Sequence, residues 1–175
     1  GRAVVCRELS GPGALRLETV PPLGAPAAGT VNIAVRAAGL NFPDLLMTRG
    51  GYQFKPPLPF VPGFDAAGVV TAIGDGVTRC KPGDRVIALL PFHGAFADEA
   101  MVDEARIFQL PEPFTFVDGA CFHVATATAT NALLQRGALQ AGEVLLVHGA
   151  GGGVGLAAVE VGKLLGATVI AGAGG

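Results

Sequence analysis

The sequence predicts a protein of mixed α/β-plus-β class, in which a strand-rich segment is followed by one strand–helix–strand unit. Three observations predict it. Short apolar runs divided by Gly and Pro recur from the N-terminus onward, an Ala- and Thr-rich stretch without Pro follows, and a run of glycines then stands between an apolar strand and a helix pattern. We expect the first segment to cover residues 1–118 and the second to cover 119–175.

The strands of the first segment are read from Val-, Leu- and Ile-rich runs bounded by turn residues. They are predicted at 2–8, 14–20, 30–38, 66–73, 85–90 and 95–102. Between two of them, residues 81–84 read Lys-Pro-Gly-Asp, which is typical of a tight turn. Many short strands with such punctuation favour a β-barrel or a sandwich.

Two helices are marked by their first residues. Asn41 can cap a short helix, with Pro43 in its first turn and Asp44 near its positive end. Thr115 and Asp118 have the spacing of a capping box, and the stretch 119–135 after them is predicted to be helical.

A strand–helix–strand unit is predicted at the end of the chain, with a strand at 144–147, a turn at 149–153, a helix at 154–165 and a strand at 168–171. Glycines in such a turn let backbone N–H groups approach a phosphate at the helix N-terminus. The pattern G-x-G-x-x-G is incomplete, because Ala150 stands where its first glycine would be. A purely structural turn is the alternative; the surrounding elements favour a dinucleotide pyrophosphate site. Its expected residues are Ala150, Gly152, Gly153, Val154 and Gly155.

The end of the second predicted strand indicates which dinucleotide is bound. NAD-binding sites place an acidic residue about 20 positions beyond the last glycine to hold the ribose 2′-hydroxyl. Residues 172–175 read Gly-Ala-Gly-Gly, so no carboxylate would repel a 2′-phosphate. The sequence therefore favours NADPH over NAD(H).

The composition excludes several classes of protein. A net charge of −2 gives no reason to expect nucleic acid or an anionic membrane as the partner. Cys6, Cys80 and Cys121 are odd in number and far apart, so neither a disulfide framework nor a closed zinc site is expected. No apolar stretch is long enough for a membrane span. We expect a cytoplasmic protein.

Several stretches together resemble the zinc-free quinone oxidoreductases of the medium-chain dehydrogenase/reductase superfamily. The matching stretches are 37–46, 51–52, 57–70, 81–86 and 149–170. The resemblance implies a GroES-like β-barrel domain at 1–118 and the first part of a Rossmann NADP-binding domain at 119–175. Because that second domain is incomplete here, we expect the chain by itself to be inactive. The resemblance allows a homodimer of the full-length protein, whose oligomeric state the sequence leaves open.

The resemblance also bears on zinc. Zinc-dependent relatives supply a cysteine where this chain has Asn41 and a histidine where it has Phe64, and the third ligand falls near His123. A catalytic zinc needs three protein ligands, which a lone histidine cannot replace. A structural-zinc lobe would fall at 91–94, which reads Pro-Phe-His-Gly. No metal is expected.

The family resemblance assigns catalytic roles to Asn41, Tyr52 and Thr128, with Asn41 and Thr128 also near the nicotinamide. Each has a structural alternative: Asn41 caps a helix, Tyr52 is a packed ring, and Thr128 alternates with Thr126 and Thr130. Cys121, His123 and His148 are interpreted as structural.

The predicted function is NADPH-dependent hydride transfer, without zinc, to a quinone or another conjugated enone, a small-molecule partner. Such acceptors take hydride directly because the product anion is delocalised, so the protein mainly positions the reactants. Two alternatives stay open. One is an enoyl-thioester reductase with Tyr52 as proton donor, and the other is a non-catalytic nucleotide-binding or structural relative.

Overall fold

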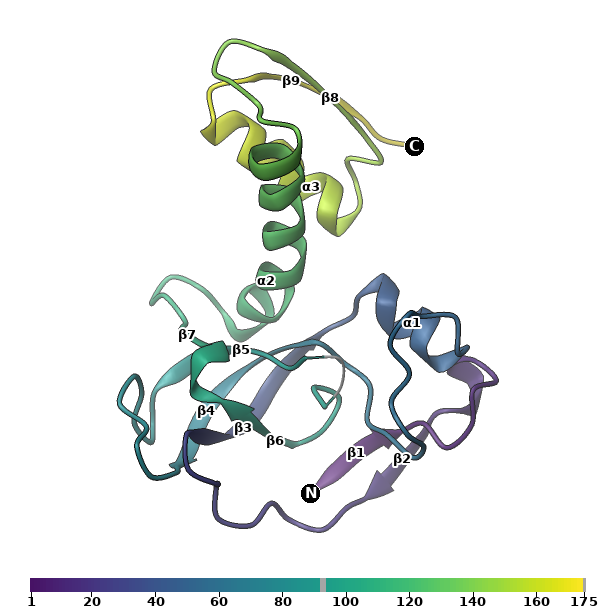
Figure 1. Cartoon of the computed structure of the whole chain (residues 1–175), viewed down its shortest axis with the longest axis vertical. Helices are drawn as coiled ribbons and strands as arrows, with labels where there is room; N and C mark the ends of the chain where they lie inside the picture. Colours follow the sequence, from purple (N-terminus) through teal and green to yellow (C-terminus); the bar gives the residue numbers. More distant parts are fainter. Residues whose placement is uncertain (92–93, 175) are drawn as a thin grey trace. The chain divides into compact units, whose positions relative to one another are not determined.

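The computed structural model describes residues 1–91 and 94–174 (Figure 1). The chain divides into two compact units, Gly1–Cys121 and Phe122–Gly175. The division falls inside helix α2 (Phe116–Thr130), as does the domain boundary expected after residue 118. Each unit is described by itself.

The first unit is built on a five-stranded antiparallel sheet of order β6-β3-β4-β5-β7. Its strands are β3 (Thr30–Gly39), β4 (Asp65–Ile73), β5 (Arg85–Leu89), β6 (Glu99–Asp103) and β7 (Ile107–Gln109). A separate antiparallel pair, β1 (Arg2–Val5) and β2 (Arg16–Thr19), is linked to the region before β6 by a bridge between Ala3 and Ala97. Among the described residues the five-stranded sheet keeps two edges, β6 and β7, so its hydrogen bonds do not close a barrel.

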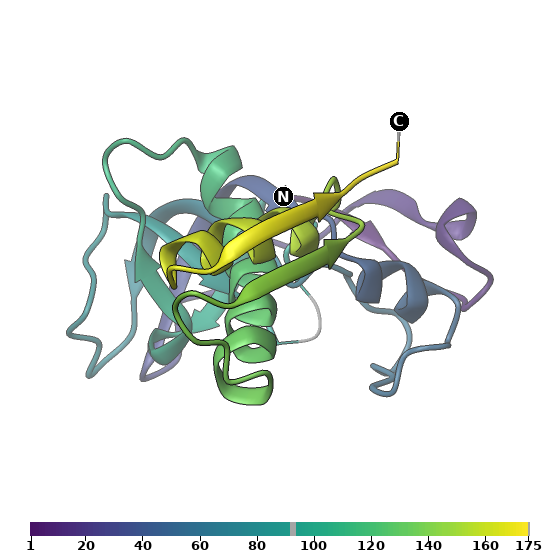
Figure 2. The ribbon, with the colours of Figure 1, turned by 90° about the horizontal axis from the view of Figure 1, so that it is seen from above.

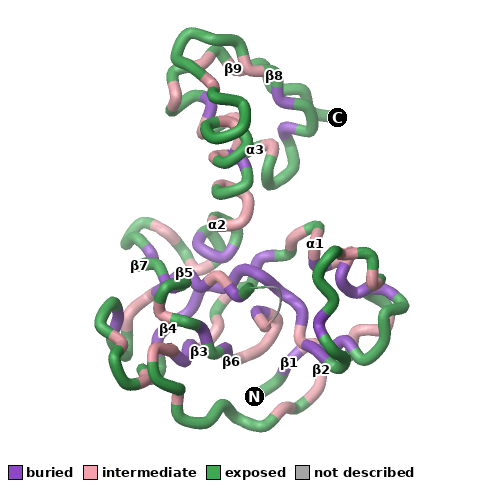
Figure 3. The backbone as a smooth tube through the Cα atoms, in the orientation of Figure 1, coloured by how far each residue is buried: buried purple, intermediate pink, exposed green. Residues whose placement is uncertain are grey.

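The core of the first unit lies against this sheet. Val31, Ile33, Ala66, Val86 and Ala88 are each fully buried in it. In Figure 3 the buried residues gather along β3, β4 and β5. Along β6 buried and exposed residues alternate, as expected for a strand with one face on a core, whereas β3 and β5 each contain three consecutive buried residues.

Three short helical elements complete the first unit. They are the 3₁₀ turns η1 (Pro12–Ala14) and η2 (Glu104–Arg106) and the helix α1 (Phe42–Thr48). Helix α2 then begins after a capping box, because the Asp118 carboxylate accepts both the backbone N–H and the hydroxyl of Thr115. Arg85 anchors this start by donating to the carbonyl of Phe114 and lying 5.0 Å from the centre of the Phe116 ring.

In the second unit, β8 (Val144–His148) and β9 (Thr168–Gly172) are parallel, with α3 (Gly153–Leu164) between them in sequence. Figure 2 shows the two strands side by side with α3 along one face. Leu145 and Val169 lie against Gly162 of α3, whereas Val144, Leu146 and Ile170 are each more than half exposed. The apolar face away from α3 is therefore open to solvent in the described chain.

Two predicted elements differ clearly from the observed ones, and one observed strand was not predicted. The strand expected at 95–102 begins only at Glu99, because the N–H groups of Ala95 and Phe96 bond instead to the carbonyls of Gly63 and Pro62. The helix expected at 119–135 begins at Phe116, and its α-helical part ends at Thr130. It continues as the π-helical turn η3 (Asn131–Arg136), and β7 was not expected.

None of the helices in the described part of the chain has the length and apolarity needed to cross a lipid bilayer.

Candidate functional site

Asn41 lies at the N-cap of α1 with extended backbone geometry (φ −117°, ψ 156°). Its backbone N–H donates to Oδ2 of Asp44 at 2.8 Å, which is the reciprocal bond of a capping box. Its side-chain Nδ2 donates to Oδ2 of Asp65 at 3.3 Å. Asn41 therefore has its backbone held from within α1 and its side chain held from the first residue of β4.

Asp44 is buried, with 2% of its surface exposed, and it also accepts the backbone N–H of Gly63 at 3.0 Å. Burial raises the pKa of Asp44 from its ordinary value of 3.8 to about 6. The two N–H donors, from Asn41 and Gly63, oppose this rise, and the nearby charge of Asp65 adds to it.

Gly63 supplies its N–H from a conformation that favours glycine, with φ of +105°. A Cβ atom there would lie 2.7 Å from both the Cβ of Ala95 and the ring of Phe96. The loop before β4 therefore depends on this glycine, and its N–H points to Asp44 as a result.

Tyr52 and Phe64 pack edge to face, with their ring centres 6.1 Å apart and their planes at 84°. Phe64 is buried, and Tyr52 is half-buried. Such pairs stabilise by about 0.5–1.5 kcal/mol beyond the area they bury. The ring of Phe64 offers no lone pair to a metal ion.

A hollow of about 480 Å³ lies beside α1, and its wall includes Asn41 and Asp44. Its other lining residues are mostly apolar: Pro12, Leu15, Leu40, Phe42, Leu45, Thr48, Pro62 and Phe96. Leu40 and Phe42 are 80% and 70% exposed. This hollow borders the predicted site residue Asn41.

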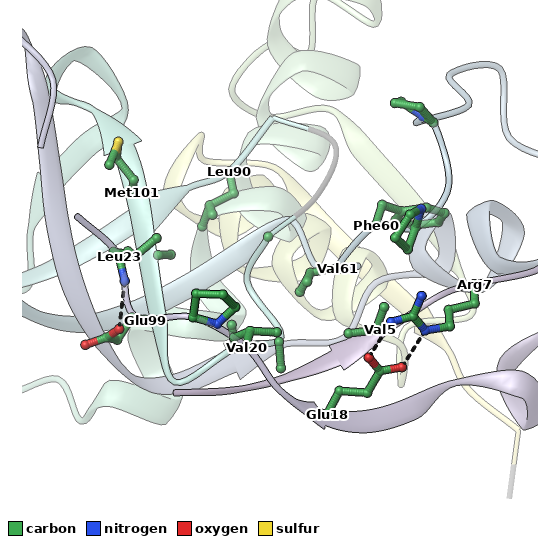
Figure 4. A pocket seen from close by; sticks show the side chains of 17 residues that line it. Val5, Arg7, Glu18, Val20, Leu23, Phe60, Val61, Leu90, Glu99 and Met101 are labelled. Atoms are coloured by element: carbon green, nitrogen blue, oxygen red, sulfur yellow. Dashed lines mark hydrogen bonds and ion pairs between the residues drawn. The ribbon is translucent and has the colours of Figure 1, made fainter.

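A second hollow, of about 580 Å³, lies elsewhere in the first unit (Figure 4). Its apolar wall includes Val5, Phe60 and Leu90, and the ion pair between Arg7 and Glu18 (2.7 Å) stands at its edge. It includes none of the predicted site residues.

In the second unit, the turn between β8 and α3 carries the predicted phosphate-binding residues. Gly149 has φ of +69°, and its carbonyl accepts the N–H of Gly152 at 3.0 Å, while the N–H of Ala150 donates to Gly172 at 3.0 Å. Helix α3 begins at Gly153 with Gly152 as N-cap. Gly151, Gly152, Gly153 and Val154 are all exposed.

The turn brings α3 very close to the end of β8. A Cβ atom at Gly155 would lie 2.2 Å from the carbonyl oxygen of Gly149. The first N–H groups of a helix have no partner inside it, and the helix dipole adds a partial positive charge there. An exposed helix start with this glycine contact therefore fits a phosphate group.

Thr128 lies on α2, in the second unit, and its hydroxyl donates to the carbonyl of Val124 at 2.6 Å. Cys121 is exposed, and burial lowers the pKa of His123. The structure thus joins Asn41 to Asp44 and Asp65 in the first unit, and places Ala150, Gly152, Gly153, Val154 and Gly155 in one turn of the second.

Among the described residues, no three His, Cys, Asp or Glu side chains gather as a metal site. Phe92 and His93, within the segment considered for a structural-zinc lobe, lie outside the described residues.

One contact at this site was not expected from the sequence. The pairing of Asn41 with Asp65 joins residues 24 positions apart. The capping pattern of Asn41 and Asp44 is visible in the sequence, but nothing in it shows which later residue faces the Asn41 amide.

Comparison with known proteins places these observations in a family. Residues 27–112 match the alcohol dehydrogenase GroES-like domain. Human (Homo sapiens) quinone oxidoreductase is 38% identical over 173 residues, which cover 99% of this chain and 53% of that protein. The chain spans about half the length of the curated relatives it matches.

Solved structures agree with this match. The Escherichia coli quinone oxidoreductase complexed with NADPH is 31% identical with a TM-score of 0.87, over 97% of this chain and 51% of that one. An NAD-dependent alcohol dehydrogenase is 32% identical with a TM-score of 0.94, over 100% of this chain and 58% of that one. The resemblance read from the sequence is confirmed: this chain belongs to the quinone oxidoreductase family of the medium-chain dehydrogenase/reductases.

Proposed function

We propose that this chain belongs to an NADPH-dependent oxidoreductase that reduces a quinone or another conjugated enone. The observation that carries the proposal is the turn between β8 and α3, where Gly155 lies against the Gly149 carbonyl at an exposed helix start. When bound, NADPH would supply the hydride; Ala150, Gly152, Gly153, Val154 and Gly155 would hold its pyrophosphate.

The residues after β9 favour NADPH. The ribose-binding carboxylate of NAD sites stands near the end of the second strand of such a unit. Here β9 ends at Gly172, and Ala173 and Gly174 come next, so no carboxylate stands there to exclude a 2′-phosphate. The Escherichia coli relative was solved with NADPH, which supports the same choice.

The acceptor is inferred from the chemistry that the side chains of the first unit can supply. Phe64, packed on Tyr52, has no lone pair to help hold a zinc ion. A quinone or enone needs less electrophilic help than a simple ketone, because its product anion is delocalised. In this proposal Asn41, Tyr52 and Thr128 contact the reactants, and Asn41 and Thr128 also meet the nicotinamide.

The test is a substrate panel on the full-length protein, with loss of NADPH absorbance followed by stopped flow. The panel contains quinones, short enones and α,β-unsaturated thioesters, each with NADPH and with NADH. We expect quinones and enones to be reduced and NADPH to bind more tightly than NADH by isothermal titration. No NADPH oxidation with any quinone or enone would overturn the proposal.

The alternatives appear as distinct outcomes of this panel. Turnover confined to the thioesters would identify an enoyl-thioester reductase. Tight NADPH binding without turnover would identify a non-catalytic relative. The cytoplasmic location and the homodimer of the full-length protein stay predictions, and size-exclusion chromatography with light scattering tests the dimer.

A further inference from the structure

Asp44 is a buried carboxylate to which the proposed reaction gives no direct part. Its two oxygens accept from two separate segments of backbone: Oδ2 from the N–H of Asn41 and Oδ1 from the N–H of Gly63, which lies 19 residues further along the chain. Both bonds, at 2.8 and 3.0 Å, have ordinary hydrogen-bond lengths. A single side chain thus joins the start of α1 to the loop before β4.

We propose that Asp44 is a positioning residue, which fixes the direction in which the Asn41 side chain faces the reactants. The effect of Asp44 on turnover rests on the proposed function, whereas its role in holding Asn41 and Gly63 does not. Asp44 holds the backbone of Asn41, and through Gly63 it holds the segment that leads directly into Asp65. It therefore fixes both ends of the contact between the Asn41 amide and the Asp65 carboxylate.

The partner of the Asn41 side chain decides which of its atoms a ligand can meet. An ionised carboxylate only accepts hydrogen bonds, so the amide turns its NH₂ group toward Asp65. The amide oxygen Oδ1 is thereby turned toward the start of α1, where the Asn41 side chain meets the backbone N–H of Asp44 in the capping box. A shift of the α1 start relative to β4 would change that direction.

The Gly63 side of this arrangement has little freedom. With φ of +105° and a Cβ position only 2.7 Å from Ala95 and Phe96, residue 63 has to be glycine. Its N–H is therefore presented in one direction, and the carboxylate of Asp44 is the group that receives it. The N–H groups of Asn41 and Gly63 each need an acceptor oxygen. An amide in place of the Asp44 carboxylate would offer only one.

The two hydrogen bonds of Asp44 depend on the charge of its carboxyl group. Burial, with the charge of Asp65 at the start of β4 adding to it, places the pKa of Asp44 at about 6. Protonation turns one carboxylate oxygen into an O–H donor and a weaker acceptor, so a protonated Asp44 holds the two N–H groups less firmly. Below about pH 6 the tie between α1 and the Gly63 loop should therefore weaken.

The first experiment measures turnover by the full-length protein with NADPH and a quinone, for wild type, Asp44→Asn and the control Asp103→Asn. Asp103 also accepts a backbone N–H, that of Ala105 at 2.8 Å, but it is exposed and caps η2. We expect Asp44→Asn to lower kcat by about 10- to 100-fold with little change in KM. The control Asp103→Asn should change neither kcat nor KM. A kcat for Asp44→Asn equal to that of wild type would overturn the inference.

The pH profile separates positioning from a general loss of stability. Wild-type kcat should fall below about pH 6, and this acid limb should be absent from the residual activity of Asp44→Asn. The same limb in both proteins would show that another group titrates and would also overturn the inference.

A second measurement needs neither activity nor a variant that folds. In full-length wild type labelled with nitrogen-15 asparagine, the side-chain NH₂ signal of Asn41 should move with a midpoint near pH 6, while that of Asn131 should not. An Asn41 signal that stays fixed from about pH 5 to 8 would overturn the role of Asp44. If no quinone is reduced, the proposed function fails, yet this titration still decides the inference.

Discussion

Gly155 lies so close to Gly149 that a methyl group on Gly155 would stand 2.2 Å from the Gly149 carbonyl oxygen and 2.9 Å from the Cα of Ala150. The same oxygen accepts the N–H of Gly152 at 3.0 Å. The atom that closes the turn is thus also the one against which α3 packs. Because the contact is with backbone, no side-chain rotation can relieve it.

Gly155→Ala should therefore deform the turn. We expect a loss of about 1–3 kcal/mol in the free energy of unfolding, typical of overpacking. The displaced N–H groups should raise the Kd for NADPH by at least about tenfold, since each 1.4 kcal/mol is a factor of ten. Chemical denaturation measures the first effect and isothermal titration the second, both on the full-length protein.

Gly153→Ala is the matched control for stability in the same turn. A Cβ atom at Gly153 meets nothing nearer than the Cβ of Ala125 at 3.9 Å. Since alanine favours a helix over glycine by about 1 kcal/mol, this variant should unfold at equal or higher denaturant concentration than wild type. Equal stability of the two alanine variants would contradict the close contact at Gly155.

Asp44 makes the stability of the protein depend on pH in a defined direction. Its pKa is about 6 in the fold and 3.8 ordinarily, so the native state holds the proton more tightly than the unfolded state. The contribution of Asp44 is fully favourable below about pH 4 and is lost as the pH rises through about 6. The difference between the two pKa values corresponds to about 3 kcal/mol.

Asp44→Asn should remove this dependence. At acid pH, where Asp44 is protonated and offers one carbonyl-type acceptor oxygen as the amide does, the variant and wild type should have similar stability. As the pH rises from about 4 to 7, wild type should lose stability relative to the variant. Denaturation curves at a series of pH values test this, and parallel stability profiles for the two proteins would refute it.

The contribution of Asp118 to stability should depend on pH in the opposite direction. Bonds from the Thr115 hydroxyl and N–H lower the pKa of Asp118, so its stabilising contribution is present at neutral pH and is lost as the pH falls through its lowered pKa. The cost of Asp118→Asn should therefore be greatest near neutral pH and disappear in acid. A cost that stays constant with pH would contradict the capping box seen here.

Metal removal should leave the enzyme unchanged. The ring of Phe64 offers no lone pair to a metal ion, and the described residues gather no group of three ligands. We expect prolonged treatment with a chelator to leave NADPH-dependent turnover as it was. Elemental analysis of the full-length protein should find far less than one zinc per chain. Loss of activity that added zinc restores would refute this.

Much of the fold could be predicted because its signals are local. The starts of β4, α1 and α3 lie within one residue of their predicted positions, since each follows a cap, a turn or a change of periodicity. The short strand β7 carries too little pattern in three residues to be recognised.

The contacts that shape the candidate site are not local, and this limits the sequence reading. Asn41 and Asp65 meet because β3 and β4 pair in a register that brings Gly39 opposite Asp65. Similarly, residues 95–97 have a strand-like composition, but the N–H groups of Ala95 and Phe96 donate to loop carbonyls, and the Phe96 carbonyl accepts an N–H group from β1. Such partners follow from the folded arrangement rather than from any pattern along the chain.

Tyr52→Phe tests which acceptor chemistry the site performs. The edge-to-face contact with Phe64 involves only the rings, so the substitution should leave stability within about 0.5 kcal/mol. If hydride passes to a quinone, no proton has to come from Tyr52, and kcat/KM should stay within about threefold, or 0.7 kcal/mol. If Tyr52 protonates a reduced thioester, the loss should approach the factor of about 100 or more typical of general acids.

Tyr52→Leu completes this test, because it removes the ring as well as the hydroxyl. It should lower the free energy of unfolding by about 0.5–1.5 kcal/mol or more, since the contact with the Phe64 ring is lost. A quinone reductase should then lose activity in Tyr52→Leu but not in Tyr52→Phe, since the ring shapes the site. Equal, large losses in both variants would assign the essential part to the hydroxyl and contradict direct hydride transfer to a quinone.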